Sequence, residues 1–326
     1  MICTLTINPA IDKLLFVSRF QRDNTNRIVR SMDVLGGKGT HVSTNLRILN
    51  CDNRAYGIGF GKTGHKIEDM LKGQGVDVHF LHYETGESRT NYALIEENHK
   101  CSLITERGTI ISSGICEKLL NIMEESLDDG DDLVLSGDAS NTEIPYIYNV
   151  IMERLDTGGK KIRIYLDTSS GNLIRGIEKK PFLVKPNVDE LSQVVGKAIA
   201  SEADILDGIF QIASKGIECV AVSRGGDGSI VKYRELIYQV DALKVDVKNT
   251  IGCGDAFLSG MVYGFSREME FEEILKLATG ISAATAESEL TVGFDYQRAM
   301  ELKEQVRMKR LTVHRNDGKE QLRSFL

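Results

Sequence analysis

Short apolar segments rich in β-branched residues alternate with longer segments of helical periodicity, and this alternation limits the fold more than any other feature. The segments predicted to form buried strands are Ile2–Ile7, Ala55–Gly59, Asp132–Ser136, Ile162–Asp167, Phe182–Val184 and Cys219–Ser223. Helical patterns lie between or after them, at 42–49, 67–71, 116–127, 144–155, 205–214, 256–265 and 271–286. Strands that alternate with helices form parallel βα units. We therefore predict an α/β fold, a three-layer α/β/α sandwich around a mostly parallel sheet.

Two segments break this rhythm, at about 13–34 and 88–105. Each alternates apolar and polar residues without an intervening helix, which predicts a small β lid. No linker rich in Pro, Gly or Ser divides the chain, so we predict one domain over residues 1–306. Residues 307–326 are charged and weakly patterned, and we expect them to form a frayed tail. An apolar lid with one exposed face favours a homodimer through the lids.

The charge and composition exclude several classes of partner. The chain of 326 residues has a formal net charge of −7 and lacks a clustered basic stripe, which argues against nucleic acid or an anionic membrane. No segment approaches the roughly 20 apolar residues of a membrane span, and the first residues lack a basic flank, so we expect a cytoplasmic protein. The six cysteines lack Cys-x-x-Cys spacing, which is typical of reduced thiols.

A glycine-rich turn precedes an apolar helix within Asn249–Gly260. Gly252 and Gly254 allow a tight turn whose N–H groups point in one direction, and the helix adds its positive end, so a transferring phosphoryl group would be stabilised there. Asp255 would remain ionised beside it and accept the proton of an attacking sugar hydroxyl. Cys253 could supply a thiolate, but no His stands near it in sequence, which favours a backbone role. The alternative for the segment is an ordinary loop with an acidic N-cap.

A second glycine-rich segment, Gly36–His41, opens another helix. Gly37 allows a ligand to approach the backbone closely, and Lys38 offers a cation, so a sugar phosphate would fit. The segment is not a Walker A loop, and the alternative interpretation is a plain glycine-rich turn. Asp12 follows the first strand, where its carboxylate could accept hydrogen bonds from two sugar hydroxyls or simply occupy a surface turn.

Two further loops follow predicted strands. In Lys185–Leu191, Asn187 and Glu190 lie at the start of a helix, near the carboxyl end of the sheet where ligands of open α/β sheets bind. They could orient the hydration shell of Mg²⁺, or form an N-cap with a capping-box Glu, and both can hold at once. Ser223–Gly228 is either a nucleotide-phosphate loop or a tight turn, and its position favours the nucleotide.

Taken in order, these segments resemble the PfkB family of carbohydrate kinases, over roughly Met1 to Val306. The Asn8-Pro9-Ala10 start with Gly-Gly-Lys-Gly is similar to the branch that contains 1-phosphofructokinase and tagatose-6-phosphate kinase. The resemblance implies a ribokinase-like sandwich with a β lid. It also implies ATP-dependent phosphorylation of a ketohexose phosphate, with Mg²⁺ and, in many members, a monovalent cation.

The resemblance also assigns roles to individual residues. By it, Asp255 is the catalytic base, Gly252, Cys253 and Gly254 form the anion hole, and Glu190 with Asn187 supports Mg²⁺. The implied ATP-binding residues are Lys185, Asn187, Ser223, Gly225, Gly226, Gly228, Thr250 and Gly254. The implied substrate-binding residues are Asp12, Gly37, Lys38, His41, Arg89, Asn91 and Asp255.

The departures from the branch fall on the acceptor side. His41 stands where the branch usually has Asn, Ala93 stands where many 1-phosphofructokinases have Lys, and Asp138 lies in a loop that is usually Gly-Ser-Leu-Pro. A lost cation and an added carboxylate would both weaken binding of an anionic acceptor. Two alternatives therefore stay open: a kinase of an unphosphorylated sugar or nucleoside, and a non-catalytic sensor of a sugar phosphate or nucleotide.

Overall fold

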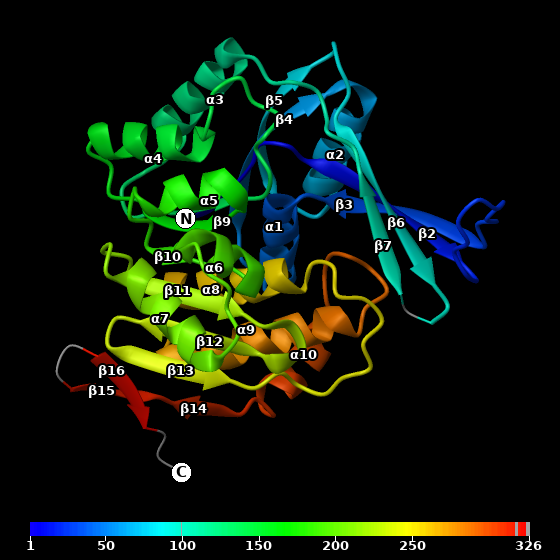
Figure 1. The fold of residues 1–326 in the computed structure, drawn as a ribbon. Coiled ribbons are helices and arrows are strands. Elements are labelled where there is room, and N and C mark those ends of the chain that lie inside the picture. Colours follow the sequence, from blue (N-terminus) through cyan, green and yellow to red (C-terminus); the bar gives the residue numbers. More distant parts are fainter. Residues whose placement is uncertain (99, 317–318, 324–326) are drawn as a thin grey trace.

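A ten-stranded sheet forms the centre of the computed structural model, which describes residues 1–98, 100–316 and 319–323 (Figure 1). The strand order is β14-β13-β12-β11-β10-β9-β8-β1-β4-β5. All neighbours from β5 to β11 are parallel, whereas β12, β13 and β14 continue the sheet in antiparallel pairs. The strands are β1 (Ile2–Thr6), β4 (Asn53–Phe60), β5 (Asp77–Tyr83), β8 (Asp132–Ser136), β9 (Arg163–Asp167), β10 (Leu183–Val184), β11 (Cys219–Ser223), β12 (Ser229–Tyr233), β13 (Leu236–Val240) and β14 (Met308–Arg310).

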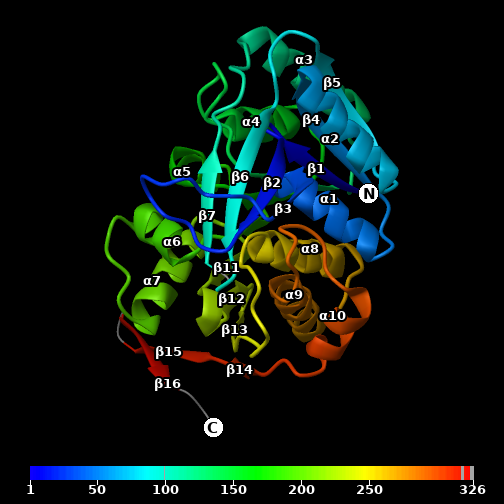
Figure 2. The ribbon, with the colours of Figure 1, turned by 90° about the vertical axis from the view of Figure 1, so that its right-hand side faces the viewer.

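Helices cover both faces of this sheet, which confirms the predicted three-layer sandwich (Figure 2). Neighbouring strand residues enter opposite layers: Leu133 and Leu135 pack in one apolar cluster, and Val134 packs in the other. One layer contains α3 (Ser113–Ser126), α4 (Ile147–Thr157), α5 (Ser170–Ile177), α6 (Val188–Val195) and α7 (Glu202–Ala213). The other contains α1 (Lys38–Ile48), α2 (Gly61–Gly73), α8 (Cys253–Ser266), α9 (Phe271–Ala286) and α10 (Tyr296–Lys303), with α10 packed on α9. Among the described residues, no helix has the length and apolar character needed to cross a bilayer.

The predicted lid is a separate four-stranded sheet that projects from the body (Figure 1). Its order is β3-β2-β6-β7, with β2 and β6 parallel and the outer pairs antiparallel. Its inner face packs Leu14 and Ala93 against Ile67 and Leu71 of α2. The strands are β2 (Ala10–Val17), β3 (Arg30–Gly36), β6 (Arg89–Glu96) and β7 (Cys101–Thr105).

The C-terminal segment differs from the predicted frayed tail. Met308–Arg310 forms β14, which pairs with β13 at the edge of the main sheet. Beyond it, β15 (Thr312–Asn316) and β16 (Lys319–Arg323) form an antiparallel hairpin. A three-residue strand among charged residues carries too little apolar pattern to be recognised in the sequence. The end of the domain at residue 306 stays a prediction.

Candidate active site

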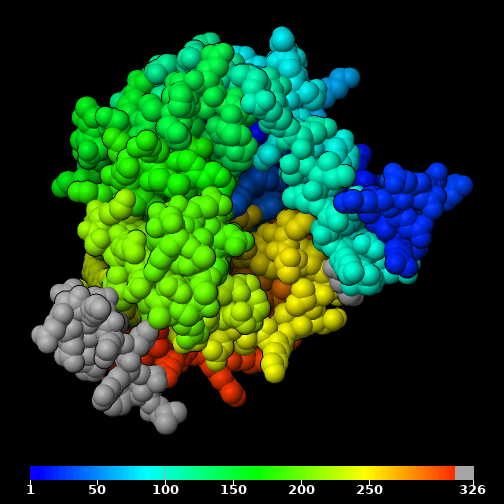
Figure 3. All heavy atoms as spheres, viewed as in Figure 1, coloured from blue at the N-terminus to red at the C-terminus, as the bar shows by residue number. Residues whose placement is uncertain are grey.

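The sequence motifs converge at the carboxyl edge of the parallel strands. The segments that follow β1, β8, β9, β10 and β11 all meet there, as expected for a ligand site of an open α/β sheet. The space-filling view shows a hollow between the green, cyan and yellow parts of the surface, with the blue of α1 on its floor (Figure 3). The lid borders this hollow, so a ligand held there would lie between the body and the lid.

Helix α8 begins at this edge with a left-handed residue. Gly252 is its N-cap with φ of 81°, and a Cβ at this position would lie 1.9 Å from the Thr291 carbonyl oxygen, so only glycine fits. The first intrahelical bond runs from Ala256 N–H to the Gly252 carbonyl oxygen at 2.8 Å. The preceding N–H groups, those of Cys253, Gly254 and Asp255, therefore have no partner within the helix and are suited to an anion.

The buried Asp255 carboxylate is hydrogen-bonded to an imidazole. Asp255 Oδ2 lies 2.7 Å from His41 Nδ1, and His41 Nε2 lies 3.0 Å from the Leu35 carbonyl oxygen. A carbonyl oxygen only accepts, so Nε2 carries a proton, and a second proton is shared between Nδ1 and Asp255. Burial disfavours the imidazolium, but the hydrogen bond to Asp255 and the charges of Asp255 and Asp12 outweigh it and raise the pKa of His41.

A second buried carboxylate, Asp167, ends β9 and holds two lysines. Lys38 Nζ donates to Asp167 Oδ1 at 2.9 Å, and Lys185 Nζ lies 3.3 Å from Oδ2. Burial alone would raise the pKa of Asp167, but the charges of Lys185 and Lys38 outweigh it and lower that pKa. A Cβ added to Gly254 would lie 3.3 Å from Lys185 Nζ, so this ammonium group lies beside the start of α8.

Several residues predicted for the acceptor side lie near Asp12 on β2. Asn91 Nδ2 donates to Asp12 Oδ1 at 2.7 Å, and a Cβ at Gly36 would lie 2.1 Å from the same oxygen, so glycine leaves the room that this carboxylate needs. Burial raises the pKa of Asp12, despite the opposing charge of His41. Arg89 Nε donates to the Asn8 carbonyl oxygen at 3.1 Å. Burial lowers the pKa of Arg89, and the negative charges of Asp138 and Asp12 oppose that shift.

An apolar cavity of about 320 Å³ is lined by Cys253, Gly254 and Phe257 of α8. Its polar rim contains most of the residues predicted for ATP: Ser223, Gly225, Gly226, Gly228, Thr250 and Gly254. Its walls are Val240, Leu243, Val245, Val247, Phe257, Ala283 and Ala286. Gly228 has φ of 82°, and a Cβ there would lie 2.0 Å from the Val240 carbonyl oxygen, so the turn requires glycine. A flat apolar base with a phosphorylated tail fits such a cavity.

Asn187 and Glu190 form the predicted helix cap. The Asn187 side chain accepts from Glu190 N–H at 2.8 Å, and Glu190 Oε2 accepts from Asn187 N–H at 2.9 Å. The structure therefore contains the capping box named as the alternative. Whether both side chains also orient Mg²⁺ stays a prediction.

Other structural details bear on the sequence predictions. Burial raises the pKa of the Cys253 thiol to about 12, which disfavours a thiolate. The Asp138 carboxylate accepts from both the N–H and the hydroxyl of Ser140. Ala93 is fully buried in the apolar contact between the lid and α2, so it offers no polar group to a ligand.

Sequence reasoning missed three elements of the site. Asp167 appears in the sequence analysis only as the end of a predicted strand. Its carboxylate at the carboxyl edge of the sheet is the signal that could have identified it as a site residue. The loop at 241–247, which forms a wall of the cavity, has no motif. Thr279 lines the cavity with a buried hydroxyl that has no hydrogen-bond partner among the described residues, and it lies within an apolar helix pattern that hid it.

The model of the pfkB family of carbohydrate kinases matches residues 6–295. The chain belongs to this family. It is therefore an ATP-dependent phosphotransferase that acts on a carbohydrate, and both the recognised family and the ribokinase-like fold are confirmed.

Named relatives agree with this assignment. The chain is 31% identical to a 1-phosphofructokinase of Bacillus subtilis over 89% of this chain and 93% of that protein. It is 28% identical to a 1-phosphofructokinase of Borreliella burgdorferi over 88% of this chain and 92% of that protein. A crystal structure of phosphofructokinase-2 from Escherichia coli in complex with potassium superposes with a TM-score of 0.86, at 21% identity, over 93% of this chain and 98% of that one. This last likeness concerns the fold.

Proposed function

We propose that the enzyme phosphorylates a ketohexose phosphate, as a 1-phosphofructokinase or a tagatose-6-phosphate kinase does. One observation carries the proposal: the start of α8 lines the apolar cavity with Cys253 and Gly254, and the next residue, Asp255, is joined through His41 to the polar group of Asp12. The names of both relatives favour 1-phosphofructokinase within this class.

The donor side would hold ATP with its base in the apolar cavity and its phosphates towards Ser223–Gly228 and Lys185. Asn187 and Glu190 offer the oxygen donors that Mg²⁺ prefers, and they would hold it through its waters. When bound, Mg²⁺ neutralises charge on the nucleotide phosphates. We also propose a monovalent cation near the loop before α8, since the Escherichia coli structure contains potassium.

Asp255 would accept the proton of the attacking hydroxyl. General-base catalysis contributes about 10²–10⁴-fold, and the remaining acceleration comes mostly from positioning and electrostatics. The amides of Cys253 and Gly254, with the Lys185 ammonium beside them, would stabilise the transferred phosphoryl group. We propose that His41 acts through Asp255 by sharing its proton.

On the acceptor side, Asp12 and Asn91 would hold sugar hydroxyls, while Lys38 and Arg89 would supply positive charge near Gly37. Asp138 lies close enough to Arg89 to act on its pKa, so a phosphate held by Arg89 would also feel that negative charge. This observation and the apolar setting of Ala93 favour a second candidate, a kinase of an unphosphorylated sugar or nucleoside. A sensor without catalysis is disfavoured, since the chain belongs to a family of kinases.

Substrate identity can be tested by ADP release from magnesium-ATP. The panel is fructose 1-phosphate, tagatose 6-phosphate, fructose 6-phosphate, their unphosphorylated sugars and a nucleoside. We expect turnover with a ketohexose phosphate, with fructose 1-phosphate best. Turnover only with an unphosphorylated sugar or nucleoside would select the second candidate, and ATP binding without turnover across the panel would contradict both candidates.

We retain the homodimer and the cytoplasmic location as proposals. The strand β7 at the edge of the lid exposes Leu103 and Ile104, at 49% and 57% of their surface, which suits contact with a second copy. Sedimentation velocity at micromolar concentration should give a dimer, and a monomer would count against the lid contact.

A further inference from the structure

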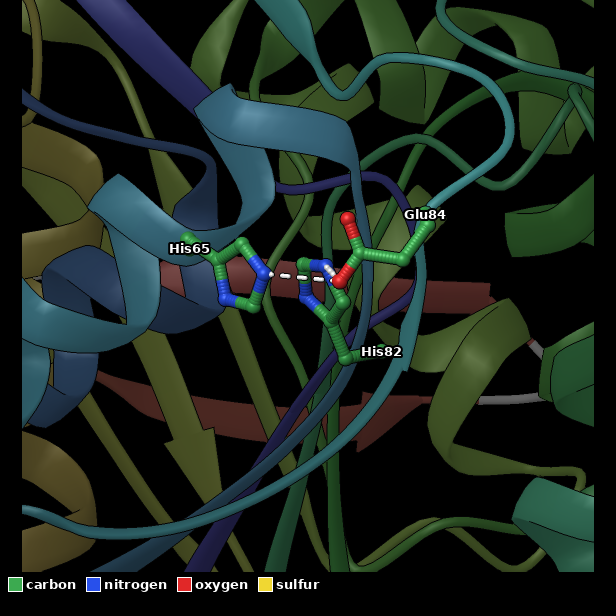
Figure 4. A group of neighbouring side chains, drawn as sticks. All are labelled: His65, His82 and Glu84. Carbon is green, nitrogen blue, oxygen red and sulfur yellow. Dashed lines mark hydrogen bonds and ion pairs between the residues drawn. The ribbon is translucent and has the colours of Figure 1, made fainter.

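Two imidazoles and a carboxylate meet on the surface where α2 and β5 lie side by side. Figure 4 shows His65 on α2, His82 at the end of β5, and Glu84 just after that strand. His65 Nε2 lies 3.1 Å from Glu84 Oε1, and His82 Nε2 lies 3.6 Å from the same oxygen. One ligand atom from each residue lies within 4.8 Å of the other two. This cluster is separate from the residues assigned to ATP or to the sugar.

A hydrogen bond to the Glu68 carboxylate favours one tautomer of the neutral His82 imidazole. His82 Nδ1 lies 2.8 Å from Oε1 of Glu68, a residue with only 8% of its surface exposed. With Nδ1–H donating to that carboxylate, a neutral His82 keeps a lone pair on Nε2. Nε2 is itself buried and has no hydrogen-bond partner among the described residues, and it faces the cluster. A ligating histidine commonly donates its other N–H to a carboxylate in this way.

Two glycines allow this arrangement. A Cβ at Gly64 would lie 2.8 Å from the Gly59 carbonyl carbon, so the start of α2 packs directly on the backbone of β4. A Cβ at Gly59 would lie 3.0 Å from Glu68 Oε1 and 3.3 Å from His82 Nδ1. The absence of both side chains leaves room for the Glu68–His82 hydrogen bond and brings His65 over His82, with ring centroids 3.5 Å apart.

We propose that His65, His82 and Glu84 bind a transition-metal dication of the Zn²⁺ class. With metal–ligand distances of about 2.0–2.1 Å, ligands of a tetrahedral ion lie about 3.3 Å apart, and the two separations from Glu84 Oε1 lie on either side of that value. Two imidazoles select Zn²⁺, Ni²⁺, Cu²⁺ or Co²⁺ over Mg²⁺, which prefers oxygen donors. Because Glu84 and His65 face solvent, water fills the remaining coordination position.

The metal would clamp α2 to the segment that leads into the lid. This segment, 84–88, already accepts from Thr63 N–H of α2 through Glu87, and Ser88 N–H donates to the Phe60 carbonyl oxygen at 3.0 Å. Arg89 follows it directly. Metal binding would therefore stabilise the link between the body and the lid.

The test is isothermal titration of the full chain with Zn²⁺ alone, without ATP or chelator, together with thermal unfolding. We expect one ion per chain and a higher Tm with metal. His65→Ala removes an exposed ligand with little risk to folding, and it should weaken binding at least about tenfold. Glu68→Gln, which leaves all three ligands in place, should weaken it by about 10–100-fold.

His79→Ala is the matched control, since His79 lies on the same strand and pairs with Asp77 outside the cluster. This variant should bind Zn²⁺ with the affinity of the unchanged protein. In a second measurement, bound Co²⁺ should show the visible spectrum of tetrahedral coordination only when His65 is present. Equal zinc affinity in the unchanged protein, His65→Ala and Glu68→Gln would overturn the proposal. So would loss of binding in His79→Ala alone, or the lack of any saturable site.

Discussion

Asp167 and Asp255 are both buried carboxylates, one at the end of β9 and one at the start of α8, but they differ in their partners. Asp167 is paired with two lysines, Lys38 and Lys185, whereas Asp255 is paired with one imidazole, that of His41. Lys38 has a raised pKa, because its attraction to Asp167 and Asp255 outweighs its burial. Lys38 therefore keeps its positive charge, while the imidazole pair can lose a proton.

The different partners suit the two carboxylates to two different tasks. A carboxylate neutralised by lysines is a fixed scaffold that positions ammonium groups for phosphates. A carboxylate that shares a proton with an imidazole is suited to proton transfer, because imidazole changes charge nearer neutrality than any other unperturbed side chain. The following variants test this separation.

Asp255→Asn should have the largest effect on catalysis. The amide keeps the size of the side chain but cannot accept the hydroxyl proton, so kcat should fall by about 10²–10⁴-fold. ATP binding, measured by titration calorimetry, should change little. A variant that retains more than about a tenth of the activity would remove Asp255 from the role of base.

Asp167→Asn should act on stability first. It leaves Lys38 and Lys185 close together without their common counter-charge, and breaking a buried ion pair costs about 3–5 kcal/mol. We expect a loss of about 3 kcal/mol in the free energy of unfolding. This value is at the low end of that range because Lys38 is partly exposed. Denaturant unfolding measures this, with Asp52→Asn as a control whose side chain is 94% exposed. Equal stability of the two variants would show that Asp167 is not a scaffold.

His41→Asn should change the pH profile of activity. Deprotonation of His41 removes a positive charge beside the group proposed as the base, so kcat/KM should rise about tenfold as pH increases through the raised pKa of His41. Other charged groups near the pair are Asp12, which faces His41 from β2, Arg89 beyond it, and Lys38, whose charge acts on Asp255. The variant should lack this rise, and His79→Asn should retain it. Superimposable profiles for His41→Asn and the unchanged enzyme would exclude the coupling.

The same histidine should give the opposite pH dependence in stability. A raised folded-state pKa means that the imidazolium stabilises the fold fully below its ordinary value of about 6.5, and that this contribution is lost as pH rises through the raised pKa. Denaturant unfolding across that window should show the decline in the unchanged protein and a weaker one in His41→Asn.

Asp138→Ser should give the smallest effect. Removal of a carboxylate near Arg89 should lower the KM for a sugar phosphate by about 2–5-fold at low salt, since exposed charges interact by less than about 1 kcal/mol. KM for ATP should not change. An unaltered KM for every sugar phosphate at low ionic strength would mean that Asp138 plays no part in acceptor choice.

The sequence allowed the fold and the separate motifs to be predicted because each depends on local pattern. The alternation of apolar strands and helices predicts a parallel sheet, and a parallel sheet brings its loops to one edge. The glycine turn at Gly252 was identified because its conformation requires glycine. The strands β5, β12 and β13 were missed, because short or half-exposed segments resemble loops.

The pairings within the site could not be predicted. His41 and Asp255 are 214 residues apart, and Lys38 and Asp167 are 129 apart, so their contacts depend on how the layers pack. Asp138 shows the same limit. The sequence predicts a conflict between its charge and an anionic acceptor, but it did not show that both carboxylate oxygens of Asp138 accept hydrogen bonds from Ser140.

The short strand β14 also determines how the protein can be handled. It covers the outer edge of β13, the strand whose last residue, Val240, forms a wall of the apolar cavity proposed for ATP. A chain truncated at residue 306 would leave that edge with unpaired N–H and C=O groups, which is a template for aggregation. The Lys309 and Arg310 side chains on β14 oppose such edge-to-edge pairing by their charge. Shortened versions for crystallisation should therefore keep the chain through Arg310.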